Sequence, residues 1–221
     1  MEGEPNMTDS RRSRPAKGPL SKEIIVKTAY ELLESEGISG LSMRKIAKVL
    51  DTGASSLYVY VKNANELRAY VFDYGLMKVE ITNLKNESWK KELFELLHSY
   101  FRILFDSPGM SELALMTIPI GPNSLAITEQ ILHQLNVGGV DAKASAWGVD
   151  ILLLYAASFA YEQVARKDKG RNCNAVRTSF ETLDTVRYPM IVSLKEDMLS
   201  GEEERFQWGL DVILQGILHS K

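Results

Sequence analysis

The stretch Ser42–Leu67, SMRKIAKVLDTGASSLYVYVKNANEL, decides the fold of this 221-residue chain. Its first half predicts a short helix, because four apolar residues at intervals of 3, 1 and 3 share one helix face: Met43, Ile46, Ala47 and Leu50. Ser42 precedes that face, and its side chain is expected to cap the first turn by accepting a backbone N–H.

A second, shorter helix is expected after the break at residues 51–53. It would run from Ala54 to about Tyr60, with Leu57 and Val61 pointing back at the first helix. A helix of fewer than about 12 residues is marginal alone and must be held by packing. Two short helices joined by a tight turn form a unit that can place the second helix in a DNA groove.

Charge is distributed unevenly along the chain. The net charge is −3, which by itself argues against a nucleic-acid partner. Residues 1–70 nevertheless carry +2 and residues 71–221 carry −5, and the run 11–22 contains five cations and no acid. A small basic region on an acidic body is the electrostatic pattern expected of a DNA-binding domain attached to a larger domain.

The rest of the chain predicts an all-α protein of about nine to ten helices, an N-terminal three-helix unit followed by a larger helical domain. Residues 1–20 are expected to be a mobile basic arm, 21–67 the DNA-binding domain and 68–221 the second domain. Ser21 would cap the first helix, which Gly37 would end. Further helices are expected at about 64–83, 88–106, 111–117, 123–136, 141–167, 175–183, 189–199 and 202–219.

Two of these helices carry more apolar surface than one small core needs. The helix 141–167 is nearly all apolar, but Asp150 and two serines within it argue against a membrane span. The helix 202–219 is apolar on several faces. We expect the two helices to form the interface of a homodimer.

The segment from Ser21 to Leu67 resembles the DNA-binding domain of TetR-family transcriptional regulators. The resemblance rests on Ala29, Glu36-Gly37, Ser42 to Ala47, Ser56-Leu57-Tyr58, Tyr60, Lys62-Asn63 and Glu66-Leu67. A weaker likeness lies in residues 206–211. This chain has Asp51 where the family usually has glycine, and Asp tolerates the left-handed conformation better than most residues. Gly53 stands at the usual serine or threonine cap, and Tyr60 replaces a frequent histidine or phenylalanine.

Because the segment Ala54–Tyr60 carries no charge, affinity and sequence reading are expected to come from different residues. Cations and hydroxyl groups around it would contact phosphates, whereas small side chains would read bases, with Arg44 also able to reach a guanine edge. The candidate DNA-binding residues are Ser42, Arg44, Lys45, Lys48, Thr52, Ala54, Ser55, Ser56, Tyr58, Tyr60 and Lys62. Alternatively, Tyr58 and Tyr60 are surface or packing residues, and Lys45 and Lys48 are solvated charges on the face of their helix. The basic run 11–22 would then be only a solubilising tail.

The second domain shows no catalytic, cofactor or metal motif, since His98, His133 and His219 lie far apart. The resemblance implies a small-molecule effector, which the lining makes apolar or aromatic. Its candidate contacts are Tyr74, Met77, Phe101, Phe105, Met116, Trp147, Ile151, Tyr155 and Phe159. Aromatic and Met residues at helical spacing are more often simple core.

The sequence therefore predicts a homodimeric DNA-binding regulator, most often a repressor, that leaves a palindromic operator when a small molecule binds. The single cysteine, Cys173, and the lack of a leader fit a cytoplasmic protein. Two alternatives stay open. One is a regulator of the same fold without an effector, and the other is a helical binding protein or enzyme whose N-terminal part only resembles a DNA reader.

Overall fold

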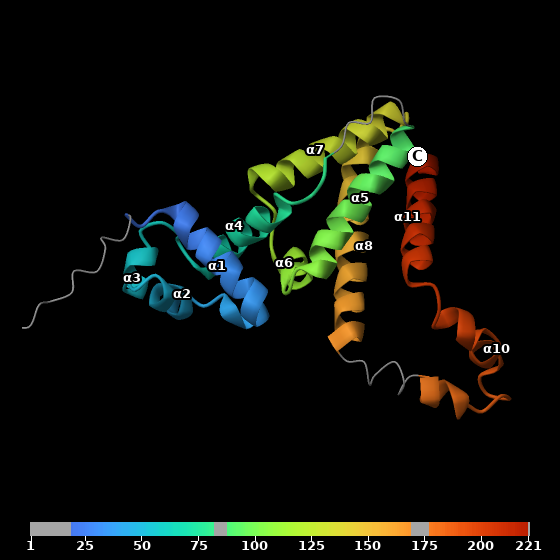
Figure 1. Ribbon diagram of the computed structural model, residues 1–221. Coiled ribbons are helices and arrows are strands. Elements are labelled where there is room, and N and C mark those ends of the chain that lie inside the picture. The colour runs from blue at the N-terminus through green and yellow to red at the C-terminus, as the bar shows by residue number, and fades with distance from the viewer. Residues whose placement is uncertain (1–18, 82–87, 169–176, 221) are drawn as a thin grey trace, which may run out of the picture.

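The computed structural model describes residues 19–81, 88–168 and 177–220, and these ranges contain helices and no strands. The prediction of an all-α fold is confirmed. Figure 1 shows a small N-terminal group of helices joined through α4 to a larger group. The elements are α1 Lys22–Glu36, η1 Gly37–Gly40, α2 Met43–Val49, α3 Ala54–Leu57, α4 Ala64–Leu76, α5 Trp89–Asp106, α6 Met110–Met116, α7 Pro122–Val137, α8 Ala142–Asp168, α10 Pro189–Met198 and α11 Glu202–His219.

Local signals set several helix ends where the sequence predicted them. The Ser21 hydroxyl oxygen accepts the Ile24 N–H at 3.3 Å and caps α1. Gly37 ends α1 at φ +65°, a left-handed conformation that favours glycine. In the same way, Asp141 accepts backbone N–H groups of the first turn of α8 at 2.9 and 3.3 Å.

The helix-turn-helix is held together by its buried face. Ile46 of α2, Leu57 of α3 and Val61 are almost completely buried. The turn is closed by the Thr52 N–H, which donates to a carbonyl of α2 at 2.9 Å, and Asp51 adopts φ +52°, as its position in the turn requires.

Three predictions about local structure were wrong. The Ser42 side chain makes no cap hydrogen bond, although its carbonyl oxygen accepts the Ile46 N–H at 3.0 Å. α3 ends at Leu57, because residues 58–60 form a turn that returns the chain to the core at Val61. α4 ends at Leu76 rather than near residue 83; residues 82 and 83 lie outside the described ranges.

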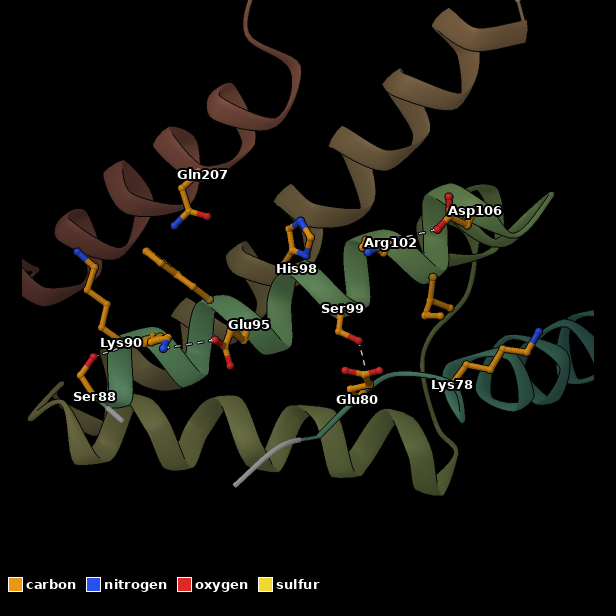
Figure 2. A pocket seen from close by; sticks show the side chains of 13 residues that line it. Lys78, Glu80, Ser88, Lys90, Glu95, His98, Ser99, Arg102, Asp106 and Gln207 are labelled. Atoms are coloured by element: carbon orange, nitrogen blue, oxygen red, sulfur yellow. Dashed lines mark hydrogen bonds and ion pairs between the residues drawn. The ribbon is translucent and has the colours of Figure 1, made fainter. Parts of the chain in front are cut away.

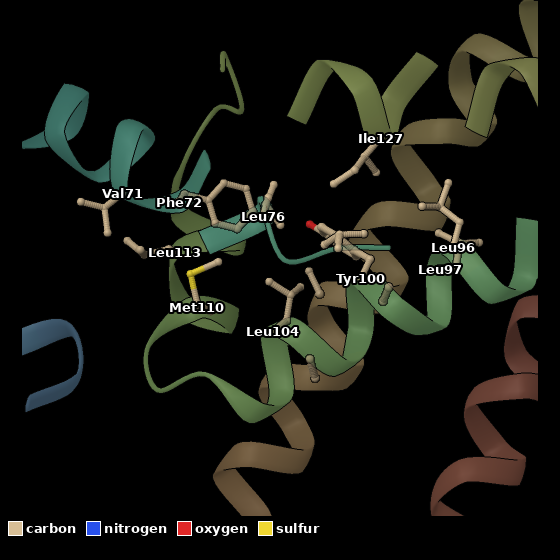
Figure 3. Packing of buried hydrophobic residues seen from close by; sticks show 14 of the residues in the cluster. Val71, Phe72, Leu76, Leu96, Leu97, Tyr100, Leu104, Met110, Leu113 and Ile127 are labelled. Atoms are coloured by element: carbon tan, nitrogen blue, oxygen red, sulfur yellow. The ribbon is translucent and has the colours of Figure 1, made fainter. Parts of the chain in front are cut away.

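The helix α4 is buried from two sides. It packs on α1 in the N-terminal group and on α5, α6 and α7 in the larger group. Figure 3 shows Phe72 and Leu76 of α4 among side chains of α5, α6 and α7, including Met110 and Tyr100. The helix α4 therefore joins the two groups within one continuous hydrophobic core.

Asp73 adds a polar attachment at this junction. Its carboxylate is buried and accepts the Ser124 N–H at 2.8 Å and the Ser124 hydroxyl at 2.9 Å, together with the Asn123 side-chain amide at 3.1 Å. Gly121 packs directly against the carboxylate, where a Cβ atom would clash. Asp73 of α4 thus caps the N-terminus of α7 from another helix, with a charge that this helix end favours.

The larger group is built around α8, which contacts α5, α6, α7 and α11. By length and composition α8 could span a membrane, but helices cover it on several sides, as is typical of the core helix of a soluble protein. At the α8–α11 contact the Tyr155 hydroxyl donates to the carbonyl oxygens of Arg205 and Phe206, at 3.2 and 3.3 Å. Gly209 makes this possible, since a Cβ there would overlap the hydroxyl.

The α10 helix differs from the others because none of its residues is buried. In Figure 1 it lies beyond the end of α11, away from the body of the molecule.

Replacing Asp73 with alanine is expected to lower the free energy of unfolding by about 3 kcal/mol, because the buried donors of Ser124 and the half-buried amide of Asn123 lose a charged acceptor. Urea denaturation of the two proteins measures the difference. The matched control is Asp106→Ala, which removes an exposed carboxylate 3.8 Å from Arg102 and is expected to cost about 0.5 kcal/mol or less. Equal losses for the two variants would contradict the structural role of Asp73.

Candidate nucleic-acid interface and effector site

The recognition segment 54–60 presents its uncharged side chains to solvent. Ser55 and Tyr58 are exposed, Tyr60 is exposed at 38%, and Ser56 and Ala54 are half-buried. The Ala54 side chain packs partly on the core, so Ser55 and Ser56 are better placed than Ala54 to reach a base edge. Thr52 is also half-buried, in the turn before α3.

Val59 is a candidate contact that the sequence reasoning missed. It lies between the two tyrosines and is 80% exposed. Since Leu57 and Val61 face the core two residues to either side, their spacing already placed Val59 on the opposite face. An exposed branched side chain of this kind can pack on a thymine methyl group in the major groove.

The cations around this segment differ in their availability. Arg44, Lys48 and Lys62 are exposed, and none forms an ion pair with another residue in the described ranges. Lys45 forms an ion pair with Glu36 at the end of α1, with the Nζ and Oε2 atoms 2.5 Å apart. The structure therefore separates three cations available for phosphate from one that already has a carboxylate partner.

The start of α4 fixes the position of Lys62. The Asn63 side-chain oxygen accepts the Glu66 N–H at 2.9 Å, while the Glu66 carboxylate accepts the Lys62 backbone N–H. The pKa of Glu66 is lowered from its usual value, first by this backbone bond and then by the Tyr70 hydroxyl. Such reciprocal capping orders the chain directly after the recognition segment.

The basic arm lies mostly outside the described residues. Arg11, Arg12, Arg14 and Lys17 fall in the range 1–18. Lys22, the last cation of the run, lies over the Tyr70 ring, 3.2 Å from its centroid. It therefore stabilises the contact between α1 and α4.

Four of the nine candidate effector contacts lie together. Phe101 and Phe105 of α5 and Phe159 of α8 form one aromatic cluster with Tyr155 and Phe206, whose ring centroids lie 4.5–5.9 Å from their neighbours. Burial raises the pKa of Tyr155, so its hydroxyl stays protonated and donates to α11. The rings pack directly on one another, and the sequence reasoning missed Phe206 as a member.

The other five candidates are placed apart from this cluster. Tyr74 packs on Tyr30 with the two rings tilted by 58° and their centroids 5.2 Å apart, and it links α4 to α1. Met77 is exposed just beyond α4, and Met116 at the end of α6. Trp147 and Ile151 are exposed on α8.

A groove of about 800 Å³ lies along the outer face of α5 (Figure 2). It runs from Lys78 past His98 to Gln207 of α11. Charged side chains line it, and several are already paired with carboxylates, as in the Lys90–Asp211 contact. A polar groove of this kind does not fit the apolar effector that the sequence predicted.

The fold and the exposed, uncharged recognition segment define a helix-turn-helix DNA-binding protein with a helical second domain. Comparison with known proteins agrees. Residues 25–71 match the model of bacterial regulatory proteins of the tetR family, and residues 82–220 match the tetracyclin repressor-like C-terminal domain. The chain belongs to the TetR family of transcriptional regulators.

Relatives extend over nearly the whole chain. The crystal structure of apo ActR from Streptomyces coelicolor is 32% identical, with 91% of this chain and 98% of ActR covered and a TM-score of 0.83. A putative transcription regulator of Streptomyces is 36% identical over 93% of this chain and 98% of its own, with a TM-score of 0.78. The repressor DrrR1 of Streptomyces coeruleorubidus is 25% identical, covering 92% and 80% of the two chains.

ActR has also been crystallised in complex with (S)-DNPA and with actinorhodin. The prediction of a ligand-responsive DNA-binding regulator of the repressor type is confirmed.

We expect Lys62→Ala to weaken binding to all DNA sequences by a similar factor, because this exposed cation, which has no ion-pair partner among the described residues, would contact phosphate. Fluorescence anisotropy at several salt concentrations measures this, and the slope of log K against log salt is expected to fall by about 1. Lys27→Ala is the control, since Lys27 lies on α1 beside Glu31 at 3.9 Å. A Lys62→Ala variant with an unchanged slope would contradict the phosphate role.

Ser55→Ala and Ser56→Ala are expected to change sequence preference instead, because their hydroxyl groups would read base edges. Loss of one base hydrogen bond is expected to change the discrimination between bases by about 1–3 kcal/mol, while the salt slope stays constant. Binding to a panel of operator variants provides the measurement. If the serine variants weakened every sequence equally, they would be phosphate contacts.

Proposed function

We propose that two copies of this chain repress transcription by binding a near-palindromic operator, and that an apolar or aromatic small molecule releases them. The observation that carries the proposal is the exposed, uncharged segment 54–60 flanked by Arg44, Lys48 and Lys62. Such a regulator would act in the bacterial cytoplasm, where operator DNA lies. Cys173, the single cysteine on which the cytoplasmic expectation rests in part, lies outside the described residues.

A dimer is supported by apolar stripes left exposed on α8 and α11. On α8, Trp147, Ile151, Leu154 and Tyr161 are exposed at intervals of 4, 3 and 7 residues. α11 adds the exposed side chains of Trp208 and Val212, four residues apart. Intervals of 3 and 4 are those of helices that pack on one another, and α8 and α11 already contact each other. A second copy would cover both stripes in one bundle of four helices.

This dimer would place two recognition helices in successive major grooves, about 34 Å apart. Arg44, Lys48, Lys62 and the arm would supply affinity by neutralising phosphates, with hydroxyl contacts from Ser42, Tyr58 and Tyr60. Ser55, Ser56, Thr52 and Val59 would read bases. We assign Lys45 a smaller role, since Glu36 already neutralises it.

The effector site that we propose is the aromatic cluster between α5, α8 and α11. Phe105 lies at its edge, half-buried, while Phe159 and Phe206 lie deeper. Because the rings touch, a ligand must separate them or slide along the exposed edge. A ligand that binds this open arrangement better than the packed one would shift the population of the dimer by its differential affinity. ActR, with its two ligand complexes, supports a site of this general kind.

The tight packing of these rings also favours a second candidate, a regulator of the same fold without a small-molecule effector. In that case the cluster is simple core, and binding to DNA depends on the amount of protein alone. The Phe101 and Phe206 centroids lie 4.5 Å apart, at the short end of the usual range for aromatic pairs.

Ile151→Glu combined with Trp208→Glu is expected to convert the dimer to a monomer of about 25 kDa, because both side chains lie on the proposed interface. Sedimentation velocity measures the mass. Leu125→Glu is the control, since Leu125 is equally exposed but lies on α7. If the double variant kept the mass of the wild type, as the Leu125→Glu control is expected to do, the interface would lie elsewhere.

Selection of bound sequences from a random DNA pool tests the operator. The expected result is two inverted half-sites whose centres lie one helical turn apart, about 10 base pairs. A single asymmetric site, or no enrichment at all, would contradict the proposed function.

Actinorhodin and (S)-DNPA are the probes for effector release. We expect at least one of them to raise the apparent Kd for the selected DNA at least tenfold, and Phe105→Ala to weaken that effect. Phe94→Ala is the matched control, because Phe94 is also half-buried on α5 but lines the polar groove. No release by either compound would favour the regulator without an effector, and release that both variants leave unchanged would exclude the cluster.

A further inference from the structure

Val59 is the most exposed large apolar side chain in residues 19–81, the described range that contains the DNA-binding unit. Its exposed fraction is 80%, against 53% for Tyr58 and 38% for Tyr60 on either side. The helix α3 ends two residues before Val59, and in Figure 1 it lies at the outer side of the N-terminal group, remote from α8 and α11. The dimer interface that we propose therefore leaves Val59 uncovered.

The backbone holds Val59 in a fixed position. The Leu57 carbonyl oxygen accepts the N–H groups of Tyr60 and Val61, at 3.0 and 3.1 Å, and so closes the turn 58–60. Leu57 and Val61 are buried in the core at the two ends of this turn. Because the turn is ordered before DNA binds, little conformational entropy is lost when Val59 enters a contact.

The recognition segment 54–60 lacks the side chains that distinguish bases by paired hydrogen bonds. Arginine or lysine binds guanine in that way, and asparagine or glutamine binds adenine. The segment, ASSLYVY, contains none of the four. A serine hydroxyl group can donate as well as accept, so the same hydroxyl suits the O4 atom of thymine or the amino group of cytosine. Serine hydroxyl groups alone therefore separate thymine poorly from cytosine.

The 5-methyl group of thymine is the feature that an apolar side chain can read. It is the apolar group of the major groove, whereas the other groups that are read there are hydrogen-bond donors or acceptors. Packing Val59 on a methyl group removes apolar surface of both partners from water, which favours binding. Cytosine lacks the methyl group, and Val59 offers no acceptor to its amino group. Val59 therefore favours thymine over cytosine.

We propose that Val59 reads the 5-methyl group of a pyrimidine in each operator half-site, and that 5-methylcytosine can replace thymine at that position. The inference rests on the proposed operator-binding function and specifies the chemistry that the site recognises. Because the contact involves the methyl group and not the O4 or amino group, its contribution is similar on the two bases. Methylation of a cytosine at this position would thus raise the affinity of the operator.

Deoxyuridine scanning of the DNA site selected from the random pool tests the contact, because deoxyuridine lacks only the methyl group of thymidine. Each thymidine of one half-site is replaced in turn, and fluorescence anisotropy gives the Kd of the full-length protein. We expect a position at which deoxyuridine weakens binding about fourfold, the effect of one buried methyl group. At that position, 5-methylcytosine is expected to bind about fourfold more tightly than cytosine.

Val59→Ala separates this contact from other effects of the methyl group on the DNA. Since Val59 is exposed, the substitution leaves the core intact. The variant is expected to bind thymidine and deoxyuridine sites equally, and cytosine and 5-methylcytosine sites equally, with the salt slope of the wild type. Val186→Ala is the matched control. Val186 is 89% exposed and lies three residues before α10, so this variant is expected to retain both differences.

Three results would overturn the inference: wild-type protein that binds every deoxyuridine-substituted site with unchanged Kd, 5-methylcytosine that binds no tighter than cytosine, or a methyl dependence that Val59→Ala retains in full. In each of these cases the protein still binds the selected site, so the proposed function stands. If the random pool yielded no bound DNA, the proposed function would fail and this inference would fail with it.

Discussion

The helix α4 constrains the whole molecule, because it packs on α1 in the N-terminal group and on α5, α6 and α7 in the larger group. Its first half is tied to the recognition segment through the capping of Asn63 and Glu66, and its second half is buried against α6 and α7. Asp73 fixes the position of α4 relative to α7. Its buried carboxylate caps α7, and a shift of α4 would leave the donors of Ser124 without an acceptor. Movement in the larger domain would therefore reach the DNA-binding unit through α4 and through the contact of Gly109, directly before α6, with Leu33 of α1.

The charges of the protein are divided between the DNA-binding unit and the larger domain. The body is acidic and repels DNA, whereas a few exposed cations surround an uncharged reading surface. In the function that we propose, association would depend strongly on salt, and discrimination between sequences would depend on small side chains that contribute little to total affinity. This separation means that base preference can change without a large change in overall binding strength.

Much of the fold could be predicted from the sequence, because local chemistry sets most helix ends. Ser21, Gly37 and Asp141 act on residues within four positions, so their roles can be recognised without a structure. The errors have a tertiary origin. The end of α3 depends on where Val61 meets the core, and the partner of Lys45 is Glu36, nine residues earlier and on another helix.

The limit of prediction from the sequence is clearer at the candidate effector site. Helical spacing identified Phe101, Phe105, Tyr155 and Phe159 as residues that face inward, and the structure brings them together. Spacing alone could not assign Trp147 and Ile151 to an exposed face of α8, because a helix that is apolar all round gives no direction. Nor could it reveal the role of Asp73, whose hydrogen-bond partner Ser124 lies 51 residues further along the chain.

The contact of Tyr155 with Gly209 has a mechanical consequence. The phenol side chain fits into the notch that the missing Cβ leaves and is tied to two carbonyl oxygens, so α11 cannot slide along α8 by a fraction of a turn. The helices α8 and α11 consequently keep a fixed register and move as one rigid body. In the dimer that we propose, the two subunits would therefore change their relative orientation by rotating as rigid bodies, without sliding of α11 along α8.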